Sequence, residues 1–150
     1  MLVLLDETPL SLATHPNSKK SKPILEWIEE LINSNASVQV PEIADYELRR
    51  ELIRSGKTRS IARLEQFELD LGFVPLNTDA IRAACKFWAD VRNIGQGGAS
   101  DISLDGDALL AGQAFIEQQR LMSRVVIATN NLKHFKHFPV EAKKWQDVKI

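Results

Sequence analysis

Hydrophobic positions along this chain fall into short continuous runs and into longer stretches with helical spacing. The runs at 2–5 and 125–128 are wholly apolar, which is typical of strands buried on both faces of a sheet, and the stretch 37–40 is predicted as another strand. A further run at 73–76 is a fourth strand candidate. The pattern therefore predicts a sheet whose central strands are covered on both sides.

The stretches between these runs carry apolar residues three and four positions apart, which predicts amphipathic helices. The expected helices start at Pro23, at Pro41 (running to about Ser55), just ahead of Ile61, at Asn77 or Thr78, and at Asp105. The glycine-rich stretch 95–100 is expected to be a loop. Alternating strands and helices imply parallel strands joined by right-handed crossovers. We expect an α/β protein: a three-layer α/β/α sandwich around a central, mainly parallel sheet, in one domain over residues 1–150.

The composition indicates the class of protein but does not indicate its binding partner. A chain of 150 residues with 44% hydrophobic and 26% charged residues fits one globular domain, and a net charge of −1 favours no partner. Cys85 is the only cysteine, which excludes an internal disulfide. No stretch approaches the roughly 20 apolar residues that span a bilayer, and the N-terminal run is too short for a signal peptide. We expect a cytoplasmic protein without membrane association.

Carboxylates stand where predicted strands and helices meet loops. Asp6 follows the first strand directly, and Asp105 and Asp107 lie where a loop meets a helix. In a parallel sheet such junctions gather at one edge, where ligands bind. Thr129 and Asn131 end the strand at 125–128 and reach the same edge. Carboxylates brought together there repel one another unless a divalent cation holds them, so the leading hypothesis is a site for a hard metal ion.

Each of these acids also has a purely structural interpretation. Asp6 can cap the turn that Thr8 and the following proline form, and Asp105 can be a helix N-cap with Asp107 in the first turn. The residues after Asp107 favour a function, because small side chains let the helix pack close to the sheet. These small residues are Ala108, Ala111, Gly112 and Ala114.

The helix that begins at Pro41 offers a further inward-facing acid. Glu47 shares a helix face with Ile43, so it can point toward the sheet edge. Arg50 and Arg54 share that face, and the alternative is an ordinary ion pair between Glu47 and Arg50.

Basic residues gather in the stretch 49–63 and in smaller groups elsewhere. The stretch contains Arg49, Arg50, Arg54, Lys57, Arg59 and Arg63, against Glu51 alone. Such a stripe on a nearly neutral protein can contact phosphates, or it can be a solvated helix face.

Taken in order, these segments resemble a PIN domain. The resemblance rests on the strand ending at Asp6, the helix with Glu47-Leu48, the segment Asp107-Ala-Leu-Leu-Ala, and the strand followed by Thr129-Asn-Asn131 and His134-Phe135. It spans essentially the whole chain and is closest to small stand-alone prokaryotic PIN proteins of the VapC toxin type.

The resemblance implies a metal-dependent endoribonuclease that hydrolyses RNA phosphodiester bonds. Mg²⁺ or Mn²⁺ would be held by Asp6, Glu47 and Asp107, with Asp105 as an accessory acid. The implied contacts to RNA come from the basic stretch at 49–63, from the lysines at 133 and 136, and from Thr8, Arg50, Arg54, Thr129, Asn131 and His134. It also implies an antitoxin protein as partner and a homodimer.

Two positions depart from the family pattern. Glu7 follows the first aspartate where Ser or Thr is common, with Thr8 one position later. His134 stands where a fourth acid is usual, and imidazole is a poor ligand for Mg²⁺. Asp105 is the candidate replacement for that acid, while His134 either contacts phosphate or packs with Phe135. The alternatives are a degenerate PIN domain that binds nucleic acid or protein, and an unrelated α/β protein whose acids are helix caps.

Overall fold

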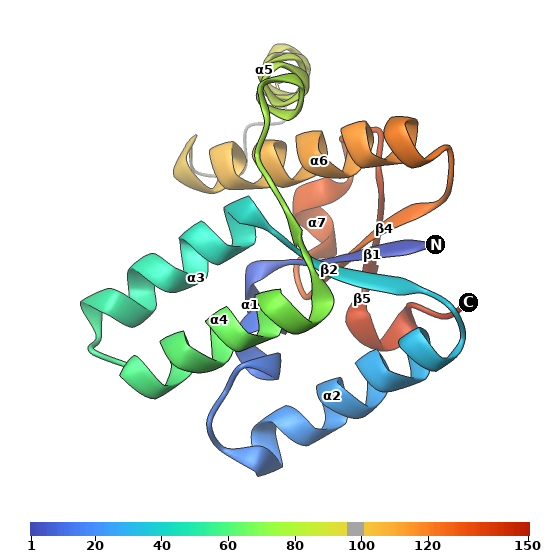
Figure 1. Cartoon of the computed structure of the whole chain (residues 1–150). Helices are drawn as coiled ribbons and strands as arrows, with labels where there is room; N and C mark the ends of the chain where they lie inside the picture. The colour runs from blue at the N-terminus through green and yellow to red at the C-terminus, as the bar shows by residue number, and fades with distance from the viewer. Residues whose placement is uncertain (96–100) are drawn as a thin grey trace.

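The computed structural model describes residues 1–95 and 101–150, and the side chains of all of these except 101–103. Within this part of the chain, five parallel strands form one sheet in the order β3-β2-β1-β4-β5 (Figure 1). They are β1 (Leu2–Leu5), β2 (Ser37–Pro41), β3 (Phe73–Val74), β4 (Val125–Thr129) and β5 (Glu141–Lys144). The register pairs Leu5 of β1 with Ala128 of β4. The predicted parallel sheet is confirmed.

Helices cover both faces of this sheet. They are α1 (Glu7–Ala13), α2 (Ser18–Asn33), α3 (Glu42–Arg54), α4 (Thr58–Leu71), α5 (Thr78–Asn93), α6 (Asp101–Leu121) and α7 (Leu132–Phe135), with a 3-10 turn at Trp145–Asp147. Alternate residues of β1 serve the two faces: Val3 and Leu5 pack with α1, α2 and α4, whereas Leu2 and Leu4 pack with α6 and α7. No described helix has the length and apolar character that crossing a membrane requires.

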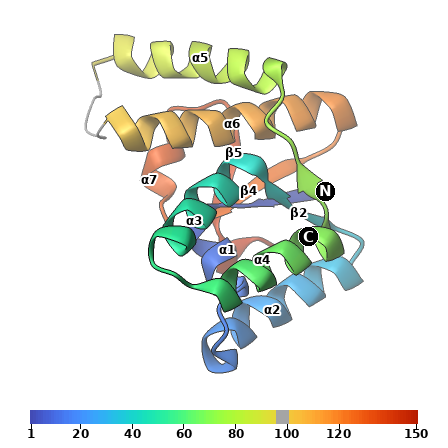
Figure 2. The same ribbon diagram turned by 60° about the vertical axis from the view of Figure 1, so that its left-hand side comes forward.

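Helix α5 forms an additional outer layer. Figure 2 shows α5 stacked on α6, with α6 between it and the sheet. The contact is close because Gly112 of α6 has no side chain: a Cβ there would lie 2.3 Å from the backbone oxygen of Ala80 in α5. Gly112 therefore faces α5 and not the sheet, which corrects the prediction that all the small residues of this helix approach the sheet. Ala108, Ala111 and Ala114 are buried as expected.

Several helix starts differ from the predictions. Helix α2 begins at Ser18, capped by the Asn17 side chain, and Pro23 lies inside it on an exposed face. Helix α6 begins at Asp101, so Asp105 is not its N-cap. Helix α1 and strand β5 were not expected, because α1 is short and β5, with the sequence Glu-Ala-Lys-Lys, has no apolar run. The loop predicted at 95–100 lies, apart from Gly95, outside the described residues.

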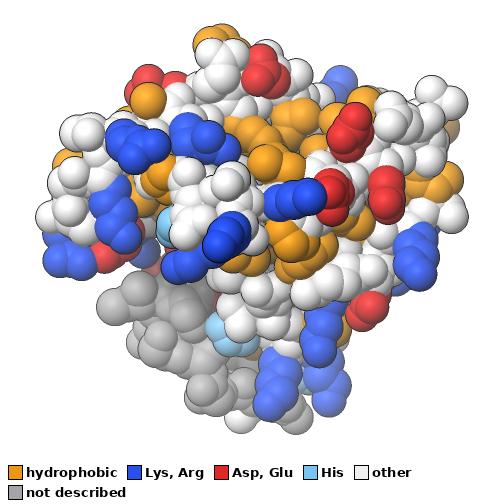
Figure 3. Space-filling view, turned by 90° about the horizontal axis from the view of Figure 1, so that it is seen from below, with side chains coloured by type: hydrophobic (Ala, Val, Ile, Leu, Met, Phe, Trp, Pro, Cys, Tyr) orange, Lys and Arg blue, Asp and Glu red, His pale blue; other side chains and the backbone are white. Residues whose placement is uncertain are grey.

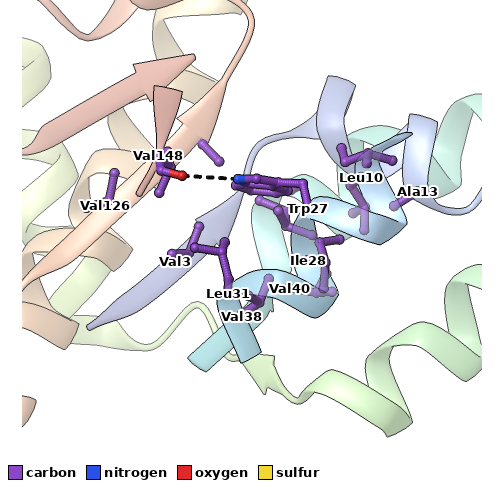
Figure 4. Packing of buried hydrophobic residues seen from close by; sticks show 14 of the residues in the cluster. Val3, Leu10, Ala13, Trp27, Ile28, Leu31, Val38, Val40, Val126 and Val148 are labelled. Carbon is purple, nitrogen blue, oxygen red and sulfur yellow. Dashed lines mark hydrogen bonds between the residues drawn. The ribbon is translucent and has the colours of Figure 1, made fainter. Parts of the chain in front are cut away.

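The C-terminal segment is fixed on the face covered by α2. The indole Nε1 of Trp27 donates a hydrogen bond to the backbone oxygen of Val148 at 3.2 Å (Figure 4). The Trp27 ring also meets the Trp145 ring edge-on, with ring centroids 5.4 Å apart. These contacts pack the end of the chain against the face of the sheet to which Val3 and Val126 belong.

Adding a methyl group at Gly112 is expected to destabilise the protein by about 1–3 kcal/mol, because the Ala80 carbonyl is backbone and cannot move aside alone. The matched control is Gly106→Ala in the same helix, where the added Cβ meets only the end of the Glu47 side chain. That change should be neutral or stabilising by up to about 1 kcal/mol, through helix propensity. Thermal and urea unfolding followed by circular dichroism measure both. Equal stability of Gly112→Ala and the wild type would contradict the close packing.

Candidate functional site

Asp6 stands where β1 ends and α1 begins, and its side chain is held on both oxygens. It is buried, with 9% of its surface exposed. Oδ1 accepts the backbone N–H of Glu7 at 2.8 Å, and Oδ2 accepts the Thr129 hydroxyl at 2.6 Å. Burial raises the pKa of Asp6, while these two hydrogen bonds oppose the rise. Asp6 is thus the N-cap of α1 and also a fixed carboxylate at the carboxyl edge of the sheet.

Thr129 reaches Asp6 because β1 and β4 are parallel neighbours that end together. Thr129 is fully buried, and its oxygen also accepts the backbone N–H of Asn131 at 2.9 Å. The threonine hydroxyl is thereby oriented to donate toward Asp6. The Asn131 side chain is on the exposed side of this turn. The predicted polar ending of this strand is confirmed, with Thr129 as its inner member.

Asp107 lies in α6 beside His134, which belongs to the short helix α7. Nδ1 of His134 is 3.1 Å from Oδ2 of Asp107, an ion-pair distance when the imidazole is protonated. The two atoms do not meet the geometry of a hydrogen bond. Oδ2 of Asp107 is buried and has no hydrogen-bond partner in the described part of the chain. Burial raises the pKa of Asp107 to about 6, His134 opposes the rise, and Asp6 adds to it. Asp107 is therefore an under-satisfied carboxylate close to Asp6.

Glu47 comes from α3 and completes the predicted trio. Its carboxylate lies over the backbone of α6 at Gly106, where a Cβ would be 3.0 Å from Oε2. Burial raises the pKa of Glu47 to about 7, and the charges of Asp6 and Asp107 raise it further, against a lowering by Arg50. Arg50 itself lies over the ring of Tyr46, 5.0 Å from its centroid. The electrostatic coupling shows that the acids predicted from β1, α3 and α6 occupy one region.

Glu7 is a fourth acid of this region that the sequence-based interpretation did not include. The pKa of Glu7 is raised by burial and then by the charge of Asp6, and Glu7 in turn raises the pKa of Glu47. Its position could have been anticipated from α1: a helix that begins directly after Asp6 keeps its first residue at the sheet edge. Thr8 lies next to it, half-buried, with its hydroxyl 3.5 Å from Oε2 of Glu7.

Asp105 does not belong to this region, which corrects its prediction as an accessory acid. Two residues along a helix correspond to about 200° of rotation, so Asp105 and Asp107 point to different sides of α6. Asp105 is exposed and lines a groove of about 360 Å³ between α5 and α6, together with Cys85 and Trp88. Glu7 and not Asp105 therefore supplies the additional negative charge.

The basic residues predicted to contact RNA are arranged unequally. Arg49 is already neutralised by ion pairs within the protein and is not available for RNA. It pairs with Asp45 at 2.9 Å, Glu65 at 3.0 Å and Glu68 at 3.6 Å. Arg54 is exposed and pairs with Glu51 one turn earlier. An exposed pair of this kind is weak and can be exchanged for another anion. Arg50 is exposed and its charge is felt by both Glu47 and Glu7.

The donor set of this region fits a hard divalent cation. Asp6, Glu47 and Asp107 offer carboxylate oxygens, the ligands that such ions prefer, and one buried oxygen of Asp107 has no hydrogen bond among the described residues. The imidazole of His134 beside Asp107 is a poorer ligand for Mg²⁺. Among the described residues, no three acidic, histidine or cysteine side chains close into a ready-made cage. Mg²⁺ does not require such a cage, because it usually keeps several waters and uses one or two carboxylates. Asp6, Glu47 and Asp107 are the residues that could hold it.

The stability of the metal-free protein should fall as the pH rises from about 5 to 7.5. The pKa of Glu47 is about 7 in the folded chain and 4.5 ordinarily, so the folded state binds more protons across this interval. The stabilisation is therefore complete below about pH 4.5 and is lost as the pH passes 7. After allowance for solvent screening, Glu47 should account for about 1–2 kcal/mol of the loss.

Urea unfolding in EDTA at the two pH values measures this loss. Glu47→Gln should show a smaller loss than the wild type, and the exposed-acid control Glu29→Gln should match the wild type. Mg²⁺ should restore stability to the wild type at pH 7.5. An undiminished pH dependence in Glu47→Gln would refute the coupling.

Comparison with known proteins places this fold. No family model matches the chain, and no curated protein matches it either. Solved structures do match: a chain of VapBC2 from Rickettsia felis, crystallised with a promoter DNA fragment, has 19% identity and a TM-score of 0.73, with 97% of this chain and 99% of that chain covered. A chain of DNA-bound VapBC from Salmonella typhimurium has 24% identity and a TM-score of 0.68, with 97% and 99% covered. A chain of FitAB bound to a DNA fragment has 17% identity and a TM-score of 0.69, with 99% and 98% covered. The chain therefore has a PIN-domain fold of the VapC type.

Proposed function

We propose that this chain is a metal-dependent endoribonuclease whose Asp6, Glu47 and Asp107 hold Mg²⁺ or Mn²⁺. The observation that carries the proposal is the meeting of acids from β1, α3 and α6 at one sheet edge. There the charges of Asp6 and Asp107 raise the pKa of Glu47, and that of Asp6 raises the pKa of Asp107. Neighbouring like charges cost stability in the free protein. Clustered carboxylates of this kind are typical of cation-binding sites, because a bound cation relieves their repulsion.

The metal ion would polarise the scissile phosphate and lower the pKa of a bound water for attack on phosphorus. The protein's own contribution is position and charge. Asp6 is held by Thr129 and by the N-terminus of α1, which limits the directions in which its free lone pairs point. Glu7 adds negative charge beside Asp6.

Cationic and polar side chains around these acids are placed to bind the RNA backbone. Arg50 and Arg54 lie on the outer side of α3, and His134 and Asn131 lie at the exposed rim next to Asp107. His134 is 38% exposed, so it can contact a phosphate oxygen while it remains beside Asp107. Thr129 is fully buried and acts through Asp6 instead of touching RNA.

The structural matches support a role as the toxin of a toxin–antitoxin pair. The matching chains come from VapBC and FitAB complexes, and the agreement covers nearly the whole length of both chains. We therefore propose a small antitoxin protein as partner, a homodimer as the assembled form, and the cytoplasm as the location.

Replacement of Asp107 by Asn should lower RNA cleavage in Mg²⁺ or Mn²⁺ by at least about 100-fold, because a metal ligand loses its charge. Asp6→Asn should do the same, and EDTA should abolish cleavage by the wild type. The matched control is Asp105→Asn, which removes the same charge two residues away on a different side of α6. Cleavage of a panel of labelled RNAs, with all variants purified in parallel, measures these effects. Equal cleavage by Asp107→Asn and Asp105→Asn would refute the assignment.

A second candidate is a PIN domain that binds RNA or protein without cleaving, and the contact between His134 and Asp107 favours it. The His134 imidazole, 3.1 Å from Asp107, occupies a position where a metal ion would otherwise act. Calorimetric titration with Mn²⁺ separates the two. The nuclease should bind Mn²⁺ saturably at pH 7.5, with binding weakened at least about tenfold by Asp107→Asn. Absence of Mn²⁺ binding in the wild type would favour the binding module.

A further inference from the structure

A pocket outside the acidic region lies where α1, α3 and α4 meet. Its volume is about 350 Å³, and its apolar floor is formed by Leu48 and Leu52 of α3. Thr14 and Ser60 are also buried in it, and its rim carries the exposed Lys57 and Arg59 with the half-buried His15. No acidic side chain lines it within the described part of the chain. The pocket is thus apolar at the bottom and cationic at the rim.

The start of α4 leaves hydrogen-bond donors without acceptors at this rim. Lys57 occupies the N-cap position and makes no capping hydrogen bond, and the first turn has no acidic residue. The backbone N–H of Thr58 is used by the oxygen of Gly56. The N–H groups of Arg59 and Ser60 have no acceptor among the described residues. Helix N-termini in this state bind anions, because their N–H groups and dipole favour negative charge.

The Ser60 side chain is an independent indication of a ligand. Ser60 is only 6% exposed and lines the pocket, yet its hydroxyl has no hydrogen-bond partner among the described residues. The oxygen is not one of the fully buried atoms without a partner, so it opens into the pocket, where a ligand or water can satisfy it. Together with the two free N–H groups, the hydroxyl forms a cluster of donors that lacks an acceptor.

The surrounding charges select an anion. Neither Lys57 nor Arg59 has an ion-pair partner within 4 Å in the part of the chain that the structure describes. Glu51 senses the charge of Lys57 but is itself paired with Arg54. Nδ1 of His15 accepts the backbone N–H of Asn17 at 3.0 Å, so the neutral ring carries its proton on Nε2 and presents a further donor. Figure 3 shows Lys and Arg side chains gathered on the side where the α3–α4 connection lies in Figure 1.

We propose that this pocket binds a phosphate group, and that the phosphate belongs to the backbone of the RNA. The second part rests on the proposed function. It is supported by proximity to the acids: Ser11 of the pocket lies one turn after Glu7 in α1, and Leu52 lies five residues after Glu47 in α3. These separations correspond to about 6–8 Å along the helix axes, a distance that a short stretch of RNA backbone can span. The pocket would hold the strand a short distance from the bond to be cut.

The first arm of the test uses inorganic phosphate as the probe. Nitrogen-15-labelled wild-type protein is titrated with phosphate, and sodium chloride at equal ionic strength serves as the reference. Saturable shifts are expected at the backbone amides of Arg59 and Ser60, with affinity reduced at least about fivefold in Ser60→Ala, which removes the hydroxyl and no charge. Shifts no larger than those with chloride would overturn the proposal.

The second arm measures binding of a fluorescent single-stranded RNA in EDTA, where cleavage is prevented. Lys57→Gln/Arg59→Gln should weaken binding about tenfold and lower the slope of log K against log salt by about 0.7 or more. The matched control is Arg82→Gln/Lys86→Gln on α5, which removes two exposed charges outside the pocket and should change the affinity less than about twofold. Phosphate binding without an effect of Lys57→Gln/Arg59→Gln on RNA affinity would overturn the RNA source and identify a site for free phosphate.

Failure of this proposal is distinguishable from failure of the nuclease assignment, because binding in EDTA and cleavage in Mg²⁺ are read separately. If the pocket variants bind RNA like the wild type while Asp107→Asn abolishes cleavage, the pocket assignment alone is wrong. If the pocket variants lose RNA affinity while no metal supports cleavage, the nuclease assignment alone is wrong.

Discussion

The hydrogen bond from Thr129 to Asp6 joins the two central strands at the point where both end. It is 2.6 Å long, buried, and formed by residues 123 positions apart in the sequence. It exists because β1 and β4 are parallel and in register, so their last residues stop at the same height. The same edge receives Glu47 from α3 and Asp107 from α6. A slip of one residue between β1 and β4 would turn Thr129 to the other face and leave the buried Asp6 with one of its two donors missing.

The apolar runs were sufficient to identify β1 and β4, because residues buried on both faces must be hydrophobic along their whole length. The edge strand β5 carries Glu141, Lys143 and Lys144 and could not be recognised by that rule. The short helix α1 was missed for a related reason: seven residues contain too few turns to display a period. The grouping of Asp6, Glu47 and Asp107 could be predicted because each residue's direction follows from its place on a strand end or helix of a parallel sheet.

The remaining acid of the site depended on a helix boundary. Asp105 was a candidate while the helix was expected to start there, because an N-cap residue can turn toward the strand ends. With α6 beginning at Asp101, Asp105 lies within regular helix and its direction is fixed by the helical period. Glu7 lies in the acidic region for a related reason: α1 starts directly after Asp6, so its first residue stays at the sheet edge. An error of a few residues in the predicted helix starts therefore led to Asp105 being assigned to the site in place of Glu7. The assignment of Asp6, Glu47 and Asp107 did not depend on those starts.

Helix α6 carries the acidic edge on one side and the outer helix on the other. Gly112, which admits the Ala80 carbonyl of α5, lies five residues after Asp107, about 7.5 Å along one rigid helix. A displacement of α5 that pushed on this seam would move α6 as a body, and Asp107 would move with it relative to Asp6, which the sheet holds still. Helix α6 thus lines the groove to α5 and also carries Asp107 of the acidic edge. The geometry of the carboxylates consequently depends on a contact on the opposite side of the helix, where there is no chemistry.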